Sequence, residues 1–415
     1  MGKNAIQIDL RQAKLFFDEW KQMCDADNGV LWGFSLHTPL MFIDDDRNIV
    51  ANQPDKDGLL HLQEDVYVGK FPADRPYSAT ATSFGGTHWG TIPWQMVSTI
   101  DKAEVLRLMF HEAFHCIQPP DFFVKNVNNG HLNNLEARIS ILLEMSALLY
   151  ALGCDGQKRM DAVKAALSAR QKRVRDFGDL SDEAFREVME GTAVYTEIRM
   201  GMPEEKHLDE LAVYVNNAKS TPMLSTYAGY CLGALYCFVL DKFDEDARRG
   251  MGWDANMAEL LRDVAKINDI QTFEMFDYTP YGYNTIIEEE KQKAEENTRR
   301  INEIKEKFIH GSVLSIYSEG RASISGQMIA VEDLGMVMRG KVDYHGEAGN
   351  LVADGGDVLK VRQDLWRVSA QDMVAEGNKL IGNDWVMNFV EDFELSPDGE
   401  GGTNWILRKR ICTNP

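Results

Sequence analysis

Residues 105–120 read VLRLMFHEAFHCIQPP. This stretch contains an H-E-x-x-H motif formed by His111, Glu112 and His115. In a helix, residues four apart lie on one face, about one turn from each other. The two imidazoles are therefore placed to hold one Zn²⁺ ion, and Glu112 to take a proton from a metal-bound water. The alternative is a pair of helical histidines that make ordinary hydrogen bonds.

The overall composition is that of a soluble globular protein. The chain has 415 residues, enough for two or three domains with a large core. Hydrophobic residues make up 44% and charged residues 26%, which is ordinary for this class. The formal net charge of −21 argues against nucleic acid or an anionic membrane surface as a partner.

Targeting and cysteine signals are weak. Residues 1–20 lack a basic segment followed by an apolar one, so no signal peptide is visible. As the chain stands this predicts a cytoplasmic protein, or an exported one if such a segment was removed. The six cysteines form no C-x-x-C pair, which disfavours a thiolate zinc site. The most apolar window, residues 224–240, is polar enough to predict a buried helix containing Cys231 and Cys237, rather than a membrane span.

Hydrophobic periodicity predicts an α+β fold whose first part, residues 1–98, is a helix followed by a small mixed sheet. The helix covers residues 9–25. Short strand-like runs follow, separated by turn residues such as the pair Gly85 and Gly86. The runs span residues 40–43, 49–52, 66–69, 77–83 and 87–93.

The remaining chain is predicted to form three further parts. Residues 99–283 have helical periodicity and form the part that carries the motif. Its further helices are expected at about 134–152, 157–175, 181–199 and 224–243. Residues 284–308 form a charged connecting helix, and 309–415 an antiparallel β domain rich in glycine and Asp-Gly turns.

A catalytic zinc keeps three protein ligands and an open position for water, so a third ligand is needed. Asp121 occupies the last histidine position of the metzincin pattern, but that pattern's glycine is replaced by Gln118. His131 lies nearby in an asparagine-rich loop. Glu190 is the preferred candidate, because a carboxylate among apolar helical neighbours is costly to bury unless it is paired or bound to a cation. Gly191 beside it permits another helix to approach closely.

The combination of H-E-x-x-H with a later E-G-x-A-x-Y, residues 190–195, resembles the gluzincin metallopeptidases, the thermolysin-like group. The resemblance covers about residues 105–200. It implies a zincin-like catalytic fold and one Zn²⁺ per chain, with Glu190 as the third ligand beside His111 and His115. It also implies hydrolysis of peptide or protein substrates by a zinc-activated water, with Glu112 as the general base.

The chain departs from the thermolysin-like pattern at Val194. Those enzymes have an aspartate four residues after the ligand glutamate, where it orients a zinc-binding histidine. Another acid must do so here. Glu144, Glu187 and Glu197 are the candidates in this sequence.

A peptidase also needs a donor for the oxyanion of the tetrahedral intermediate. Related enzymes use a downstream tyrosine or histidine, which points to Tyr230 in the apolar window 224–240. Tyr195 and Tyr227 are competitors, and each of the three is equally interpretable as an amphipathic core tyrosine.

Gluzincins bind the substrate backbone along an edge strand beside the motif helix, by strand addition. The resemblance therefore suggests Tyr77–Ser83 or Thr87–Pro93 as that strand. Gly85, Gly86 and Gly90 would let a ligand chain come close, although they serve ordinary turns equally well.

Three hypotheses follow for the whole protein. The first is a zinc metallopeptidase. The second is a catalytically silent zincin scaffold that binds a partner through its C-terminal β domain. The third is a helical binding protein whose histidines match the motif by chance. The intact Glu112 favours the first hypothesis, since a scaffold does not need the base.

Overall fold

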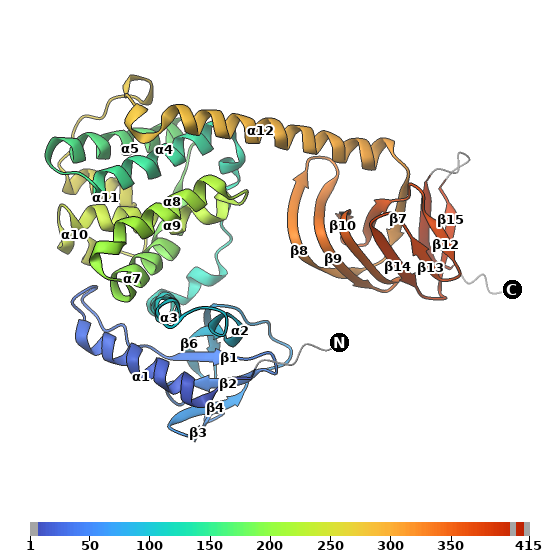
Figure 1. The fold of residues 1–415 in the computed structure, drawn as a ribbon, viewed down its shortest axis with the longest axis horizontal. Helices are drawn as coiled ribbons and strands as arrows, with labels where there is room; N and C mark the ends of the chain where they lie inside the picture. The colour runs from blue at the N-terminus through green and yellow to red at the C-terminus, as the bar shows by residue number, and fades with distance from the viewer. Residues whose placement is uncertain (1–6, 399–403, 411–415) are drawn as a thin grey trace. The chain divides into compact units, whose positions relative to one another are not determined.

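The computed structural model describes residues 7–398 and 404–410, so the position of Cys412 lies outside the described residues. The chain divides into two compact units, Met1–Lys291 and Gln292–Pro415. The first unit combines a small sheet with many helices, and the second is a curled sheet (Figure 1). The predicted mixture of helix and sheet is therefore confirmed.

The first unit begins with helix α1 and a six-stranded sheet. Helix α1 spans Leu10–Asp27. Its N-cap is Asp9, whose side chain accepts hydrogen bonds from two backbone amides of the first turn. The sheet order is β3-β4-β2-β1-β6-β5, and only the β1–β6 pair is parallel. The strands are β1 Leu40–Ile43, β2 Asn48–Ala51, β3 His61–Gln63, β4 Val66–Lys70, β5 Thr80–Phe84 and β6 Thr87–Pro93.

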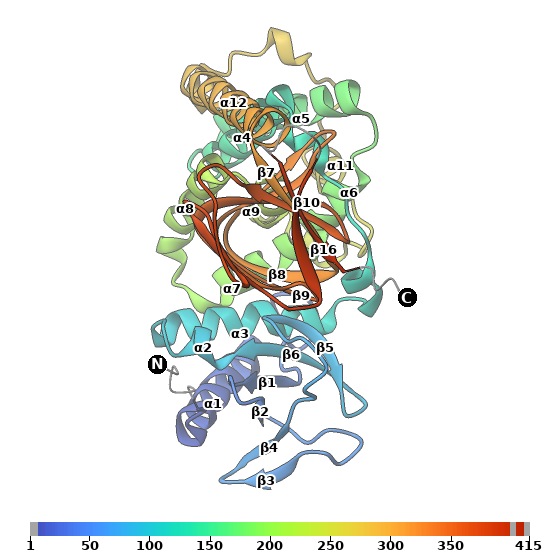
Figure 2. The ribbon, with the colours of Figure 1, turned by 90° about the vertical axis from the view of Figure 1, so that its right-hand side faces the viewer.

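The two faces of this sheet contact different cores, because side chains alternate along a strand. Leu40 and Phe42 face the main core, where the Phe42 ring stacks on Phe17 of α1 at 4.9 Å. Met41 and Ile43 face a smaller core on the other side. The helix that carries the motif, α3 (Lys102–Ile117), lies along the sheet, between the sheet and the helices that follow in the chain (Figure 2).

The glycines of the β5–β6 hairpin serve the fold. Gly85 and Gly86 have φ values of 55° and 68°, as the tight turn requires. A Cβ atom on Gly90 would lie 2.7 Å from the backbone oxygen of Glu112, so the motif helix itself occupies the space suggested for a ligand. Thr87–Pro93 is also not an edge strand, because β6 is paired with β1 on one side and β5 on the other. Only β5 of the two candidate strands lies at the edge.

The helical part surrounds the apolar helix α9, Leu224–Asp241, which is buried as predicted, together with Cys231 and Cys237. Among the described residues, no helix is both long and apolar enough to cross a bilayer. The other helices of this part are α2 Trp94–Val97, α4 Leu135–Leu152, α5 Gly156–Phe177, α6 Ser181–Arg186, α7 Thr192–Gly201, α8 His207–Ser220, α10 Glu245–Arg249 and α11 Met257–Val264, with short 3₁₀ turns between some of them.

The helix predicted over 181–199 is interrupted by a π-helical turn, Glu187–Gly191, between α6 and α7. Gly191 of this turn lies against Gly233 of α9. A Cβ atom on Gly191 would be 2.3 Å from the Gly233 Cα atom, so the two backbones are in direct contact. Single π turns inserted in α-helices are frequent at functional sites.

The second unit contains ten strands preceded by the C-terminal part of α12, Tyr283–Lys305, which ends in a π turn at Glu306–His310. All neighbouring strands are antiparallel except β7 and β16. The strands are β7 Val313–Tyr317, β8 Gly320–Val331, β9 Gly335–Gly346, β10 Gly349–Arg362, β11 Leu365–Ser369, β12 Val374–Glu376, β13 Lys379–Ile381, β14 Trp385–Phe389, β15 Phe393–Pro397 and β16 Trp405–Lys409. Tyr344 and Trp366 lie in its core.

Candidate metal centre

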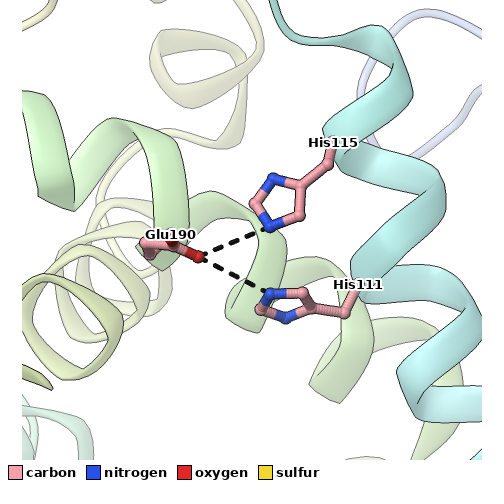
Figure 3. A group of neighbouring side chains, drawn as sticks. All are labelled: His111, His115 and Glu190. Carbon is pink, nitrogen blue, oxygen red and sulfur yellow. Dashed lines mark ion pairs between the residues drawn. The ribbon is translucent and has the colours of Figure 1, made fainter. Parts of the chain in front are cut away.

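The motif helix has well-defined ends. Asp101 and Glu104 form a reciprocal capping box at its start, with side chain–backbone distances of 2.9 and 3.1 Å. The helix ends at Ile117, because Pro119 disfavours a helical conformation for Gln118, the residue before it. Between these ends, His111 and His115 project from one face with ring centroids 4.8 Å apart (Figure 3).

Glu190 approaches both histidines from the π turn on the opposite side (Figure 3). Its Oε2 atom lies 3.7 Å from Nε2 of His111 and 3.4 Å from Nε2 of His115. One donor atom from each of the three residues lies within 4.8 Å of the others. The structure therefore brings together the three residues that the sequence suggested as metal ligands.

The spacing of these atoms fits a zinc ion better than direct contact. Two ligand bonds of about 2.0–2.1 Å at a tetrahedral angle separate their donor atoms by about 3.4 Å. Hydrogen bonds between nitrogen and oxygen are shorter, typically about 2.9–3.0 Å. Glu190 Oε2 is buried without a hydrogen-bond partner, whereas Arg186 holds the other oxygen, Oε1, at 3.1 Å. A buried carboxylate oxygen without a partner is costly, and a cation between the three side chains would satisfy it.

His111 is oriented by Glu197, one of the three acids considered for this role. Its Nδ1 atom lies 2.9 Å from Glu197 Oε2, which leaves Nε2 directed at Glu190. Glu197 is held in turn by Arg107 at 3.1 Å and by the Tyr214 hydroxyl at 2.8 Å. Burial lowers the pKa of His111, but Glu190 and Glu197 outweigh it and raise the pKa well above its usual value. Glu197 lies seven residues after Glu190, whereas the aspartate of the thermolysin-like pattern lies four residues after the glutamate.

His115 is oriented by Gln118, an amide rather than the expected acid. The His115 Nδ1 atom lies 2.8 Å from Gln118 Oε1. Of the other two acids considered, Glu187 pairs with Arg170, and Glu144 pairs with Arg170 at 3.0 Å and with Arg173. Both belong to a separate buried charge cluster.

Glu112 is 4% exposed, and its Oε2 atom has no hydrogen-bond partner. Burial raises the pKa of this carboxyl, and the positive charge that His111 and His115 can carry opposes the rise. A raised carboxyl pKa brings the group nearer to the range in which it can both accept and return a proton. Glu112 is thus a buried carboxyl whose charge interacts with those of His111, His115 and Glu190.

Tyr230 of α9 lies beside the histidines. Its ring is parallel to that of His111 within 10°, with centroids 6.1 Å apart. Burial, followed by the charge of Glu190, raises the pKa of the Tyr230 hydroxyl, which keeps it a neutral hydrogen-bond donor. Tyr227 stacks on the far side of Tyr230 at 6.1 Å. Tyr195, by contrast, donates to Asp241 at 2.5 Å and is fully buried in the core.

Two other candidates for the third ligand lie outside the group. Asp121 is exposed on a short 3₁₀ turn after the motif helix. His131 contacts Glu183 at 2.5 Å, within the separate charge cluster.

Two residues at the site were not anticipated from the sequence. Gln118 was noted only as a departure from the metzincin glycine, and Arg186 was not considered. The four-residue spacing of Arg186 and Glu190 was the available signal for the second, since residues so spaced are neighbours on a helix. For Gln118, the three-residue spacing from His115 was a local signal, but its contacts with the π turn had none, because they join residues 70–74 positions apart.

Comparisons of this chain with protein-family models, with curated proteins and with solved structures gave no match.

Proposed function

We propose that this protein is a zinc-dependent metallopeptidase of the gluzincin type, in which His111, His115 and Glu190 hold one Zn²⁺. The single observation that supports the proposal best is the position of the buried Glu190 Oε2 atom, which accepts no hydrogen bond and lies 3.4 and 3.7 Å from the two Nε2 atoms. Two imidazoles from one helix and a carboxylate from a separate helical turn form a ligand set that is typical of catalytic zinc.

Bound zinc would lower the pKa of a water molecule to about 7 and polarise a substrate carbonyl. Glu112 would serve as the general base, which accepts a proton from the attacking water and returns it to the leaving nitrogen. The Tyr230 hydroxyl donates a hydrogen bond to the oxyanion. The edge strand β5 is the place where an extended peptide would add to the sheet.

The proposal is tested with Glu112→Gln, which removes the base but none of the ligands. We expect it to retain one equivalent of zinc and to lose about 10²–10⁴-fold of the peptide hydrolysis measured on a broad peptide library. Glu104→Gln is the matched control, because Glu104 lies on the same helix but is exposed and acts only in the capping box. That variant should cleave at the wild-type rate.

Other outcomes separate the competing hypotheses. Wild-type protein that binds one zinc per chain but cleaves nothing would support the silent scaffold. Protein that binds no zinc, and whose melting temperature does not respond to a chelator, would support a binding protein with fortuitous histidines. Loss of the zinc on His111→Ala would exclude that third hypothesis.

A further inference from the structure

The side chain of Gln118 connects the two halves of the candidate metal centre. It is the first residue after the motif helix and is only 1% exposed. Its backbone is extended, with φ −66° and ψ 154°, as expected before a proline. This turn directs the side chain back beneath His115 and towards the π turn that carries Glu190.

The contacts of Gln118 determine which way its amide faces. The Nε2 atom lies 2.6 Å from the Met189 carbonyl oxygen, 3.2 Å from Thr192 Oγ1 and 3.4 Å from the Val188 carbonyl oxygen. Backbone carbonyls only accept hydrogen bonds, so the amino group must face them. The amide oxygen therefore faces His115 Nδ1, which donates to it at 2.8 Å.

This arrangement fixes two properties of the centre at once. A proton on His115 Nδ1 leaves the Nε2 lone pair free for a metal. The bond to Met189, the residue before Glu190, holds the π turn at a set distance from the motif helix. One side chain therefore sets both the tautomer of one ligand and the position of another.

The chemistry of the site explains why an amide is used here. Glu112, Glu190 and Glu197 already place three carboxylates around the two histidines. A fourth would repel them and would offer no donor to the carbonyls of the π turn. An amide supplies both an acceptor and a donor without adding charge.

We propose that Gln118 is a positioning residue that ties His115 to the π turn carrying Glu190 and thereby sets the geometry of the metal centre. The inference rests on the proposed zinc site but not on peptide hydrolysis. Removal of an outer-shell partner of a zinc ligand typically costs about 10–100-fold in metal affinity.

The test compares Gln118→Met and Gln118→Glu with the wild type. Zinc affinity is measured by chelator competition, and the ligand field by the visible spectrum of the Co²⁺-substituted protein. Methionine at position 118 has a similar length but can form neither the hydrogen bond to His115 nor the one to Met189. For Gln118→Met we therefore expect a zinc affinity about 10–100-fold lower and a changed Co²⁺ spectrum. In NMR of the zinc-loaded protein, the exchange-protected signal of His115 Nδ1–H should be lost. Gln118→Glu keeps an acceptor for His115 but sets an oxygen against the Met189 carbonyl, so its affinity should also fall.

Asn129→Leu is the matched control for general destabilisation. Asn129 is another buried amide, 6% exposed, whose side chain contacts the Asp182 backbone rather than a ligand. It should alter stability without altering zinc affinity. Zinc affinity of Gln118→Met within twofold of the wild type would overturn the proposal. If Gln118→Glu keeps the wild-type zinc affinity while Gln118→Met loses it, the hydrogen bond from Gln118 to the π turn does not help to position Glu190. A wild type without zinc would instead overturn the proposed function on which the inference rests.

Discussion

The two histidines of the candidate centre are oriented by different chemical groups. Glu197 holds His111 through a charged acceptor, whereas Gln118 holds His115 through a neutral one. Each partner is itself fixed by further hydrogen bonds, so neither ring is free to rotate. Rigid ligands reduce the ordering cost of metal binding, which is why such partners affect affinity without touching the ion.

Glu197→Gln should weaken zinc binding about tenfold or more, because the neutral amide makes His111 a weaker electron donor to the metal. The substitution also weakens the bonds from Arg107 and Tyr214. Isothermal titration or chelator competition measures the change. Glu210→Gln is the control, since Glu210 contacts Arg107 at 2.5 Å but does not contact His111. Equal zinc affinities for the two variants would contradict this role of Glu197.

At the scale of elements, the π turn Glu187–Gly191 is the feature that positions Glu190. Direct contact between Gly191 and Gly233 lets α9 approach the turn, and α9 also carries Tyr230. The glycine pair therefore affects how close Glu190, the third candidate ligand, and Tyr230, the candidate oxyanion donor, lie to the motif helix.

Gly191→Ala should destabilise the protein by about 1–3 kcal/mol, because the added methyl group meets backbone atoms that cannot turn aside. We also expect weaker zinc binding, since α9 and the π turn must separate. Gly153→Ala is the matched control. Gly153 has φ −85°, and its nearest atom to an added Cβ is 3.7 Å away, so that variant should unfold at or above the wild-type temperature. If neither variant changes the melting temperature, the close contact between Gly191 and Gly233 is excluded.

A buried charge cluster joins α4, α5, α6 and the π turn. It contains five buried side chains, Glu144, Arg170, Arg173, Glu183 and Glu187. Burial raises the pKa of Glu187 to about 7, although Arg170 opposes the rise. The charge of Glu187, at the start of the π turn, therefore changes with pH around pH 7.

Stability should fall with rising pH through the titration of Glu187. Its pKa is raised from 4.5 to about 7, so the folded state binds the proton more tightly than the unfolded state. The resulting stabilisation is complete below pH 4.5 and is lost as the pH rises through about 7. Glu187→Gln removes this titration. Relative to wild type, it should gain roughly 2–3 kcal/mol in free energy of unfolding between pH 5 and pH 8.

Urea unfolding at several pH values, in the presence of a chelator, measures this difference. Glu136→Gln serves as the control, because Glu136 of α4 is an exposed acid near Lys172 with no place in the cluster. A constant difference between Glu187→Gln and wild type over this pH range would show that Glu187 does not titrate there.

At the scale of the whole molecule, the two units have separate hydrophobic cores. Helix α12 spans the boundary between them, with Ile286 in the core of the first unit and Ile304 and Phe308 in a core of the second. All three candidate ligands lie in the first unit.

Zinc should therefore stabilise only the first unit. At a free zinc concentration 1,000 times the dissociation constant, a single site adds about 4 kcal/mol to the free energy of unfolding. Differential scanning calorimetry with zinc and with a chelator should show one transition that moves and one that does not. Two transitions that move by the same amount, or neither moving, would contradict this assignment.

The local elements near the centre were predictable from the sequence because their signals are local. The capped helix from Asp101, its end before Pro119 and the apolar helix α9 depend on neighbours a few residues apart. The turn glycines Gly85 and Gly86 were recognised for the same reason. Other elements were missed, such as the short strand β3 and the polar strand β8, whose residues have no clear apolar period. Helix α8 was also missed, although its buried residues Leu211, Val215 and Ala218 are at helical spacing.

The residues with the chemistry for a metal centre could be identified from the sequence: His111, His115 and Glu112 on one helix, and Glu190 beside a glycine among apolar neighbours. The packing of the core brings Glu190 close to both histidines and places Glu197 and Gln118 where they orient the two rings. It also places the motif helix against Gly90, where the sequence had suggested a ligand. The physical reason is range. Helical spacing acts over one or two turns. Except for the contact between His115 and Gln118, these contacts join residues about 20 to 90 positions apart and arise only when the core packs.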